Sequence, residues 1–237
     1  MALPKLGVPE FYTEIPSTGN KVKFRPFTVK QQKALLFALQ SQDLDLMIDC
    51  VHDIVDVCCY DVSSNKLAAF DIEYLFIKIR AKSVGEVIDF YLRHGSNNPC
   101  QHRQQYALNI DDVKVNMAQV EDPVIKLEAD LGVTMKYPSF REITKFSAIS
   151  KDNPTQIIEF VASVIENVFN SEDVFGEFTL DEMVEWVSNL PTTYFEQLID
   201  WLTKVPKLEH TIEYVCDECQ QSETVELKTL SDFFISA

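Results

Sequence analysis

Apolar residues recur at intervals of three and four along much of the chain, which predicts a series of amphipathic helices. In the first third of the chain these helices are expected at 28–40, 43–60 and 71–85. Leu35, Leu36 and Leu39 are expected on the buried face of the first helix. The front of the chain therefore has enough apolar helical surface to build a core.

The second half shows the same helical spacing together with shorter strand-like runs. Isoleucine, valine and phenylalanine recur through 157–169, so one strongly amphipathic helix is expected there. Two more helices are predicted at 180–190 and 193–205, and a short turn of helix at 230–235. Strands are predicted from polar and apolar alternation or from β-branched residues at 21–27, 124–127 and 133–137.

Near the C-terminus a turn with two cysteines joins two strand-like runs. Cys216 and Cys219 lie three positions apart, between the runs at 211–215 and 223–227. Two cysteines at this spacing on a tight turn can place both thiolates on one tetrahedral metal ion. This pattern of strand, turn and strand is typical of half a zinc ribbon, and a complete site needs two more ligands.

A second turn of this kind lies in the first half of the chain. His94, Cys100 and His102 occur in a segment rich in Gly, Asn and Pro, between strand-like runs at 87–92 and 106–110. Cys100 and His102 are only two positions apart, which strains simultaneous coordination, whereas Cys100 and His94 close a wider loop. The spacing leaves both histidines open as the ligand.

If the tips of the two hairpins meet, they supply four donors to one structural zinc ion. These donors are Cys100, either His94 or His102, and the pair Cys216 and Cys219. One alternative is that the metal has been lost and the residues are reduced cysteines on surface turns. Another is a disulfide between the two C-terminal cysteines.

The order of the elements predicts an α+β fold, because strands and helices occur in separate groups. We expect a mostly helical protein in which two knuckle-bearing β-hairpins of the zinc-ribbon type are brought together. Residues 1–20 are expected to form an extended N-terminal arm, and 21–237 one globular unit. Within that unit we consider two lobes, 21–118 and 119–237, joined at the knuckles.

Composition narrows the classes of function. The net charge of −16 argues against a nucleic-acid partner, because phosphate binding needs clustered lysine and arginine. Six cysteines, two of them adjacent, indicate reduced thiols and not a secreted disulfide framework.

The sequence shows neither a signal-peptide pattern nor an apolar run of the about 20 residues that span a bilayer. The sequence also has no His-Glu-x-x-His motif and no phosphate-binding glycine loop, so we predict no enzymatic activity and no small-molecule substrate.

Several blocks of the chain resemble the baseplate hub assembly family of contractile-tailed phages of the T-even type. The most specific blocks are Phe-Asp-Ile-Glu-Tyr-Leu-Phe at 70–76 and Ile-Arg-Ala-Lys-Ser-Val-Gly at 79–85. The similarity covers nearly the whole chain and is weakest over 86–160. The other blocks that carry it are 4–6, 15–19, 22–27, 206–219 and 227–234.

The resemblance implies a non-enzymatic protein of tail morphogenesis, made in the host cytoplasm, whose partners are other baseplate or hub proteins. It leaves open a stable subunit of the virion tail baseplate and a transient assembly factor, or chaperone, that is absent from the mature virion. In the family the first hairpin carries a Cys-x-x-Cys-like knuckle, whereas this chain has Cys100 and two histidines there. Less favoured alternatives are a metal-dependent enzyme and a nucleic-acid-binding zinc ribbon.

Overall fold

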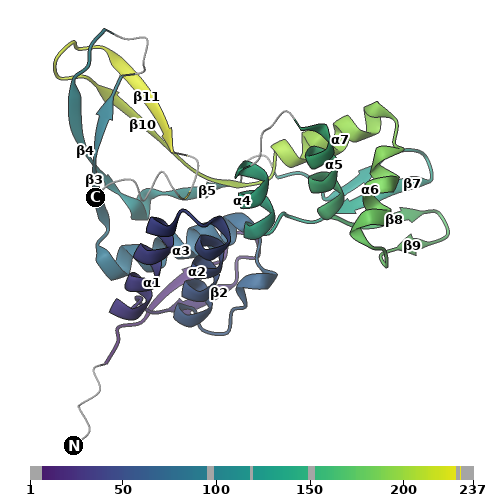
Figure 1. Ribbon diagram of the computed structural model, residues 1–237, viewed down its shortest axis with the longest axis horizontal. Helices are drawn as coiled ribbons and strands as arrows, with labels where there is room; N and C mark the ends of the chain where they lie inside the picture. The colour runs from purple at the N-terminus through teal and green to yellow at the C-terminus, as the bar shows by residue number, and fades with distance from the viewer. Residues whose placement is uncertain (1–6, 95–98, 118–119, 149–152, 228–229, 231–237) are drawn as a thin grey trace, which may run out of the picture. The chain divides into compact units, whose positions relative to one another are not determined.

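The structure is a computed structural model that describes residues 7–94, 99–117, 120–148, 153–227 and 230. The chain divides into two compact units (Figure 1). The first unit contains residues 1–64, 70–116 and 207–237, and the second contains 65–69 and 117–206. The first unit is therefore completed by the C-terminal segment of the chain.

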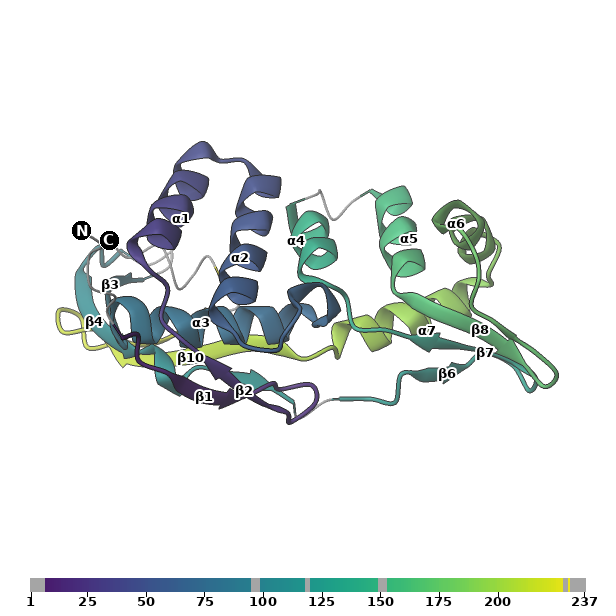
Figure 2. The same cartoon turned by 90° about the horizontal axis from the view of Figure 1, so that it is seen from below.

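In the described residues, the centre of the first unit is formed by the helices α1 (Val29–Ser41), α2 (Leu44–Cys58) and α3 (Ala69–Val84). The short 3-10 turn η1 (Ser64–Lys66) precedes α3 in the chain and belongs mostly to the second unit. Figure 2 shows α1 and α2 on the same side of α3. Large apolar side chains on α3 are fully buried, so this helix is the centre of the core. These side chains are Phe70, Ile72, Leu75, Phe76, Ile77 and Ile79.

Local capping explains where the first two helices begin. The backbone N–H of Thr28 donates to Oε1 of Gln31 at 3.0 Å, in the capping-box arrangement that a Thr-x-x-Gln pattern favours. The carboxylate of Asp43 accepts a hydrogen bond from the backbone N–H of Leu46 at 3.1 Å. Both contacts satisfy N–H groups that have no partner inside the helix.

The expected burial of α1 is wrong for two leucines. Leu36 is 52% exposed and Leu39 is 38% exposed, whereas Leu35 and Ala38 are buried. The two buried residues lie three positions apart and form a narrow strip along the helix. The buried face of α1 is therefore narrower than its apolar content indicates. Apolar periodicity predicts where a helix lies in the sequence, but it does not show how much of the helix surface other elements cover.

An N-terminal hairpin is fastened to α3 by a buried carboxylate. β1 (Phe11–Glu14) and β2 (Lys21–Phe24) pair in an antiparallel manner. In the turn between them, Ser17 donates from its backbone N–H and its hydroxyl to the carboxylate oxygens of Asp71, at 2.9 and 2.6 Å. Asp71 is completely buried, so these charge-assisted hydrogen bonds offset part of its desolvation.

The remaining strands of the first unit form two sheets. β3 (Val87–Arg93) pairs with β4 (Arg103–Asn109), and β10 (Lys207–Val215) lies between β11 (Ser222–Leu227) and β5 (Lys114–Asn116). Between β4 and β5 lies the 3-10 turn η2 (Ile110–Asp112). These pairings confirm the two hairpins that were predicted around the candidate metal ligands.

The basic run on α3 is bound within the first unit. Lys78 Nζ lies 3.0 Å from the carboxylate of Asp111 in η2, and Lys82 Nζ lies 3.2 Å from the same carboxylate. Lys82 also pairs with Glu86. These contacts hold η2, which connects the two sheets, against α3.

In its described residues, the second unit has a four-stranded antiparallel sheet and four helices. The sheet order is β6 (Val124–Lys126), β7 (Leu131–Met135), β8 (Ile165–Asn170), β9 (Val174–Phe175). The helices are α4 (Phe140–Ala148), α5 (Pro154–Ser163), α6 (Leu180–Ser188) and α7 (Thr192–Thr203). Val133, Val161, Leu198 and Trp201 are among the residues of its buried core.

The predicted fold class is wrong. The described residues are not mostly helical with two hairpins, because their strands form four separate sheets. The largest local error is at 157–169, where the expected helix ends at Ser163 and β8 begins at Ile165. Val133 of β7 pairs with Val168 of β8, so a partner distant in sequence overrides the local helical spacing. The turn of helix predicted at 230–235 lies almost entirely outside the described residues.

Candidate metal centre

The tips of two hairpins of the first unit meet (Figure 1). His94 follows the last residue of β3, and Cys100 lies shortly before β4. Cys216 follows β10, and Cys219 lies in the turn that leads to β11. The four side chains come from positions up to 125 residues apart, yet their donor atoms lie within 4.8 Å of one another.

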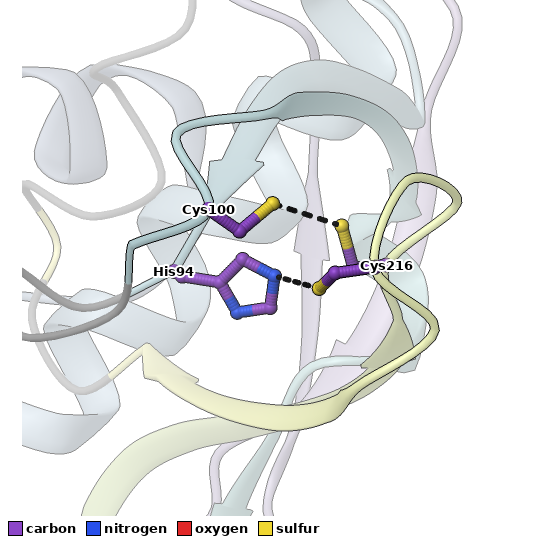
Figure 3. Close-up of side chains that lie close together, drawn as sticks. His94, Cys100 and Cys216 are labelled. Atoms are coloured by element: carbon purple, nitrogen blue, oxygen red, sulfur yellow. Dashed lines mark hydrogen bonds between the residues drawn. The ribbon is translucent and has the colours of Figure 1, made fainter.

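The donor atoms have the spacing of a tetrahedral site. Sγ of Cys100 lies 3.9 Å from Sγ of Cys216, and Nε2 of His94 lies 3.1 Å from Sγ of Cys219. Two thiolates bound to zinc at about 2.3 Å are separated by about 3.8 Å in a regular tetrahedron. Figure 3 shows the side chain of Cys100 directed toward Cys216 and the ring of His94 directed toward a neighbouring sulfur atom. The group could therefore hold a metal ion with small adjustments of side chains.

The backbone of the C-terminal turn favours a thiolate at Cys216. The N–H of Cys216 donates to the carbonyl of Gln221 at 3.0 Å, and the N–H of Gln220 donates to the carbonyl of Cys216 at 2.9 Å. Hydrogen bonds from the backbone N–H groups of Cys219 and Glu218 lower the pKa of the Cys216 thiol to about 6. Because the thiolate is the metal-binding form, this turn prepares a ligand near neutral pH.

Glu223 orients the histidine from outside the donor set. Its Oε1 lies 2.6 Å from Nδ1 of His94, whose side chain is fully buried. This close contact with the Glu223 carboxylate raises the pKa of His94. A carboxylate that holds the proton on Nδ1 leaves the lone pair of Nε2 facing the sulfur atoms, which is the arrangement found around histidine ligands of metals.

A hydrogen bond between side chain and backbone joins the two tips independently of any metal ion. Oε1 of Gln104 in β4 accepts a hydrogen bond from the backbone N–H of Asp217 at 2.9 Å. The contact sets the C-terminal turn beside the first hairpin. This hydrogen bond therefore helps to hold the four donor residues close together without a metal ion.

The structure distinguishes between the residues that were singled out from the sequence. It brings together Cys100, Cys216, Cys219 and His94, and His102 is not part of the group. All six cysteines lie in the described part of the chain and are free thiols, so no disulfide joins Cys216 to Cys219.

Glu223 was missed in the sequence, although a signal for it was present. In the hairpin register Glu223 lies opposite Tyr214, which is two residues before Cys216. Side chains that are directly opposite, or two residues apart on one strand, share a face of the sheet. Once the register is known, Glu223 is expected on the face that carries the thiol.

We expect Glu223→Ala to weaken metal binding about tenfold to hundredfold, because a carboxylate that orients a histidine ligand has effects of this size. The measurement is competition with a chromophoric chelator at neutral pH. Glu226→Ala is the matched control, since Glu226 lies on the same strand but on the opposite face. Equal metal affinity in the two variants would show that Glu223 does not support the site.

No helix in the described ranges combines the length and the apolar character that a membrane span requires. A family model described as "T4 bacteriophage base plate protein" matches residues 8–235. Searches of curated proteins and of solved structures find no match. The matched region covers most of the first compact unit, the whole of the second and all four donor residues.

Proposed function

The chain belongs to the T4 bacteriophage base plate protein family, and from this membership we propose that it is a non-enzymatic component of the baseplate hub. It acts in baseplate assembly through contacts with other baseplate proteins. The observation that carries this proposal is the family match over 8–235, which spans nearly the entire chain. The ion pairs of Lys78 and Lys82 with Asp111 argue against nucleic-acid binding at α3, because they engage two cations of its basic run within the chain itself.

The group of His94 and three cysteines is proposed to bind one structural zinc ion. Three thiolates and one imidazole are a common zinc set, and soft sulfur ligands disfavour magnesium and calcium. Four protein ligands fill a tetrahedral site and leave no position for a reactive water, which supports a structural role and not a catalytic one. The ion would join hairpins that are 116 residues apart at Cys100 and Cys216, so its binding free energy would stabilise the first unit.

A second role within the same family is a transient assembly factor that leaves before the virion is complete. A chain of this kind needs the same folded surfaces and the same structural metal. The two roles differ in where the protein is found: in the finished tail baseplate, or only in the host cytoplasm on assembly intermediates.

The test is quantitative mass spectrometry of purified virions and of baseplate intermediates from the phage that encodes the chain. A fixed copy number in virions would establish a stable subunit. Presence in intermediates and absence from virions would establish the assembly factor. Absence from both would contradict a role in the baseplate.

A further inference from the structure

A groove of about 430 Å³ runs along one edge of the sheet in the second unit. One wall is β6, which contributes Val124, Ile125 and Lys126, and the other wall is α7, which contributes Gln197, Asp200 and Trp201. Glu121 and Asp122, which precede β6, close the lining. The indole N–H of Trp201 donates to the carbonyl of Asp122 at 3.1 Å, which ties the helical wall to the segment before β6.

The strand that lines the groove is an edge strand within the described sheet, with order β6-β7-β8-β9. The carbonyl of Pro123 accepts a hydrogen bond from the N–H of Met135 at 2.8 Å. The N–H of Leu127 donates to the carbonyl of Leu131 at 2.9 Å. Hydrogen-bonded pairs alternate along an antiparallel ladder, so the N–H and C=O groups of residues 124 and 126 point away from β7. The N–H of Val124 is satisfied by the side chain of Asp122 at 2.8 Å. The carbonyl of Val124 and the N–H of Lys126 therefore face the open side.

The groove is also partly apolar. Val124 is 44% exposed, and Ile125 and the largely buried Trp201 provide further apolar surface. An extended peptide that pairs with an edge strand can place every second side chain into such a groove beside a helix. The backbone groups supply hydrogen bonds, and the apolar wall supplies contact area.

Charge identifies the kind of peptide. Three lining residues are acidic, Glu121, Asp122 and Asp200, and one is basic, Lys126. Lys204 pairs with Glu121 at 2.7 Å and with Asp200 at 2.6 Å. Between residues 153 and 203 the sequence has ten acidic residues and no lysine, arginine or histidine. The wider surface of this unit is therefore negative, and it favours a cationic partner.

We propose that the groove between β6 and α7 binds an extended basic segment of another protein, which adds to the sheet at β6. This inference deepens the proposed role in the baseplate by naming the chemistry of one partner, and it rests on that role. The segment carries alternating apolar and Lys or Arg side chains. A second copy of the chain fits less well, because its net charge of −16 opposes association at an acidic surface.

The test uses the purified full-length protein and two fluorescent peptides of identical composition. One is an eight-residue peptide that alternates lysine and valine, and the other contains the same residues as a block of lysines followed by a block of valines. Fluorescence anisotropy gives both dissociation constants. We expect the alternating peptide to bind at least about fivefold more tightly, since only its pattern suits a strand.

Two variants locate the binding. Lys126→Pro and Lys126→Ala both remove the charge, but only the first removes the outward N–H, so we expect about three- to tenfold weaker binding for proline than for alanine. Gln197→Lys places a cation on the exposed face of α7 beside the groove, and we expect it to weaken binding several-fold without unfolding the unit. This second variant keeps the test decisive if proline disturbs β6.

Equal binding of the two peptides would overturn the proposal, because diffuse attraction to an acidic surface does not depend on pattern. Unchanged binding in both the proline and the Gln197→Lys variants would also overturn it. Self-association of the free protein that the alternating peptide blocks would assign the groove to a second copy instead. None of these results alters the mass-spectrometric test in virions, so failure of this inference and failure of the proposed function are distinguishable.

Discussion

Cys216→Ser is expected to reduce bound zinc from about one equivalent per chain to none and to destabilise the first unit. Cys216 is almost completely buried, and its sulfur is 3.9 Å from that of Cys100 in the other hairpin. A structural zinc site contributes its binding free energy to folding. Loss of about 3 kcal/mol, a small part of that contribution, would lower Tm by about 6–12 °C for a chain of this size. Elemental analysis and thermal unfolding measure the two effects.

A chelator provides the matched comparison for this variant. It should lower the Tm of the wild-type protein toward that of Cys216→Ser and leave the variant unchanged, because the variant has no metal to lose. Cys50→Ala removes a buried thiol from α2, away from the hairpin tips, and should keep its zinc. A wild-type protein that is stable and free of metal, or a Cys216→Ser protein that retains one equivalent, would contradict the structural zinc site.

His94→Ala is expected to weaken metal binding at least about 100-fold, more than loss of an orienting residue does, because it removes one of four ligands. His102→Ala is expected to leave the metal affinity nearly unchanged, since His102 does not belong to the group of donors. The two histidines lie on the same turn, so the pair of variants is closely matched. Metal competition at neutral pH compares them directly.

A third variant separates coordination from packing. His94 is buried, so its loss also leaves a cavity and an unpartnered Glu223. His94→Cys supplies a fourth thiolate and should recover much of the metal affinity that alanine loses. Equal losses in His94→Ala and His102→Ala would contradict the ligand set, as would a loss confined to His102→Ala.

Much of the candidate site could be predicted because metal ligation has a short-range pattern. The Cys216 and Cys219 spacing, with strand-like runs on both sides, indicated a metal-binding turn before any contact was known. The second turn was found by the same reasoning, and its donors do meet the first pair. Spacing alone left His94 and His102 equivalent, because coordination depends on where a side chain points and not on its distance along the chain.

The errors in the fold have a common cause. Leu36 and Leu39 have helical spacing and lie in a helix, but no element covers them in the described part of the first unit. The segment at 165–170 has helical spacing and forms β8, because β7 offers it a hydrogen-bonded partner. In both cases the local pattern states what a segment can do, and the neighbours decide which surface is used and which hydrogen bonds form.

The sequence by itself determined the helices of the front half, the turns that carry the metal ligands and the resemblance to the baseplate family. These features depend on neighbouring residues, such as caps, apolar periods and ligand spacing. Only the tertiary structure decided that His94 joins the three cysteines, that Glu223 supports it, and that β6 lies at an open edge beside α7. Each of these depends on a contact between segments far apart in the chain. Such contacts are selected by packing and hydrogen bonding in three dimensions, which no local pattern contains.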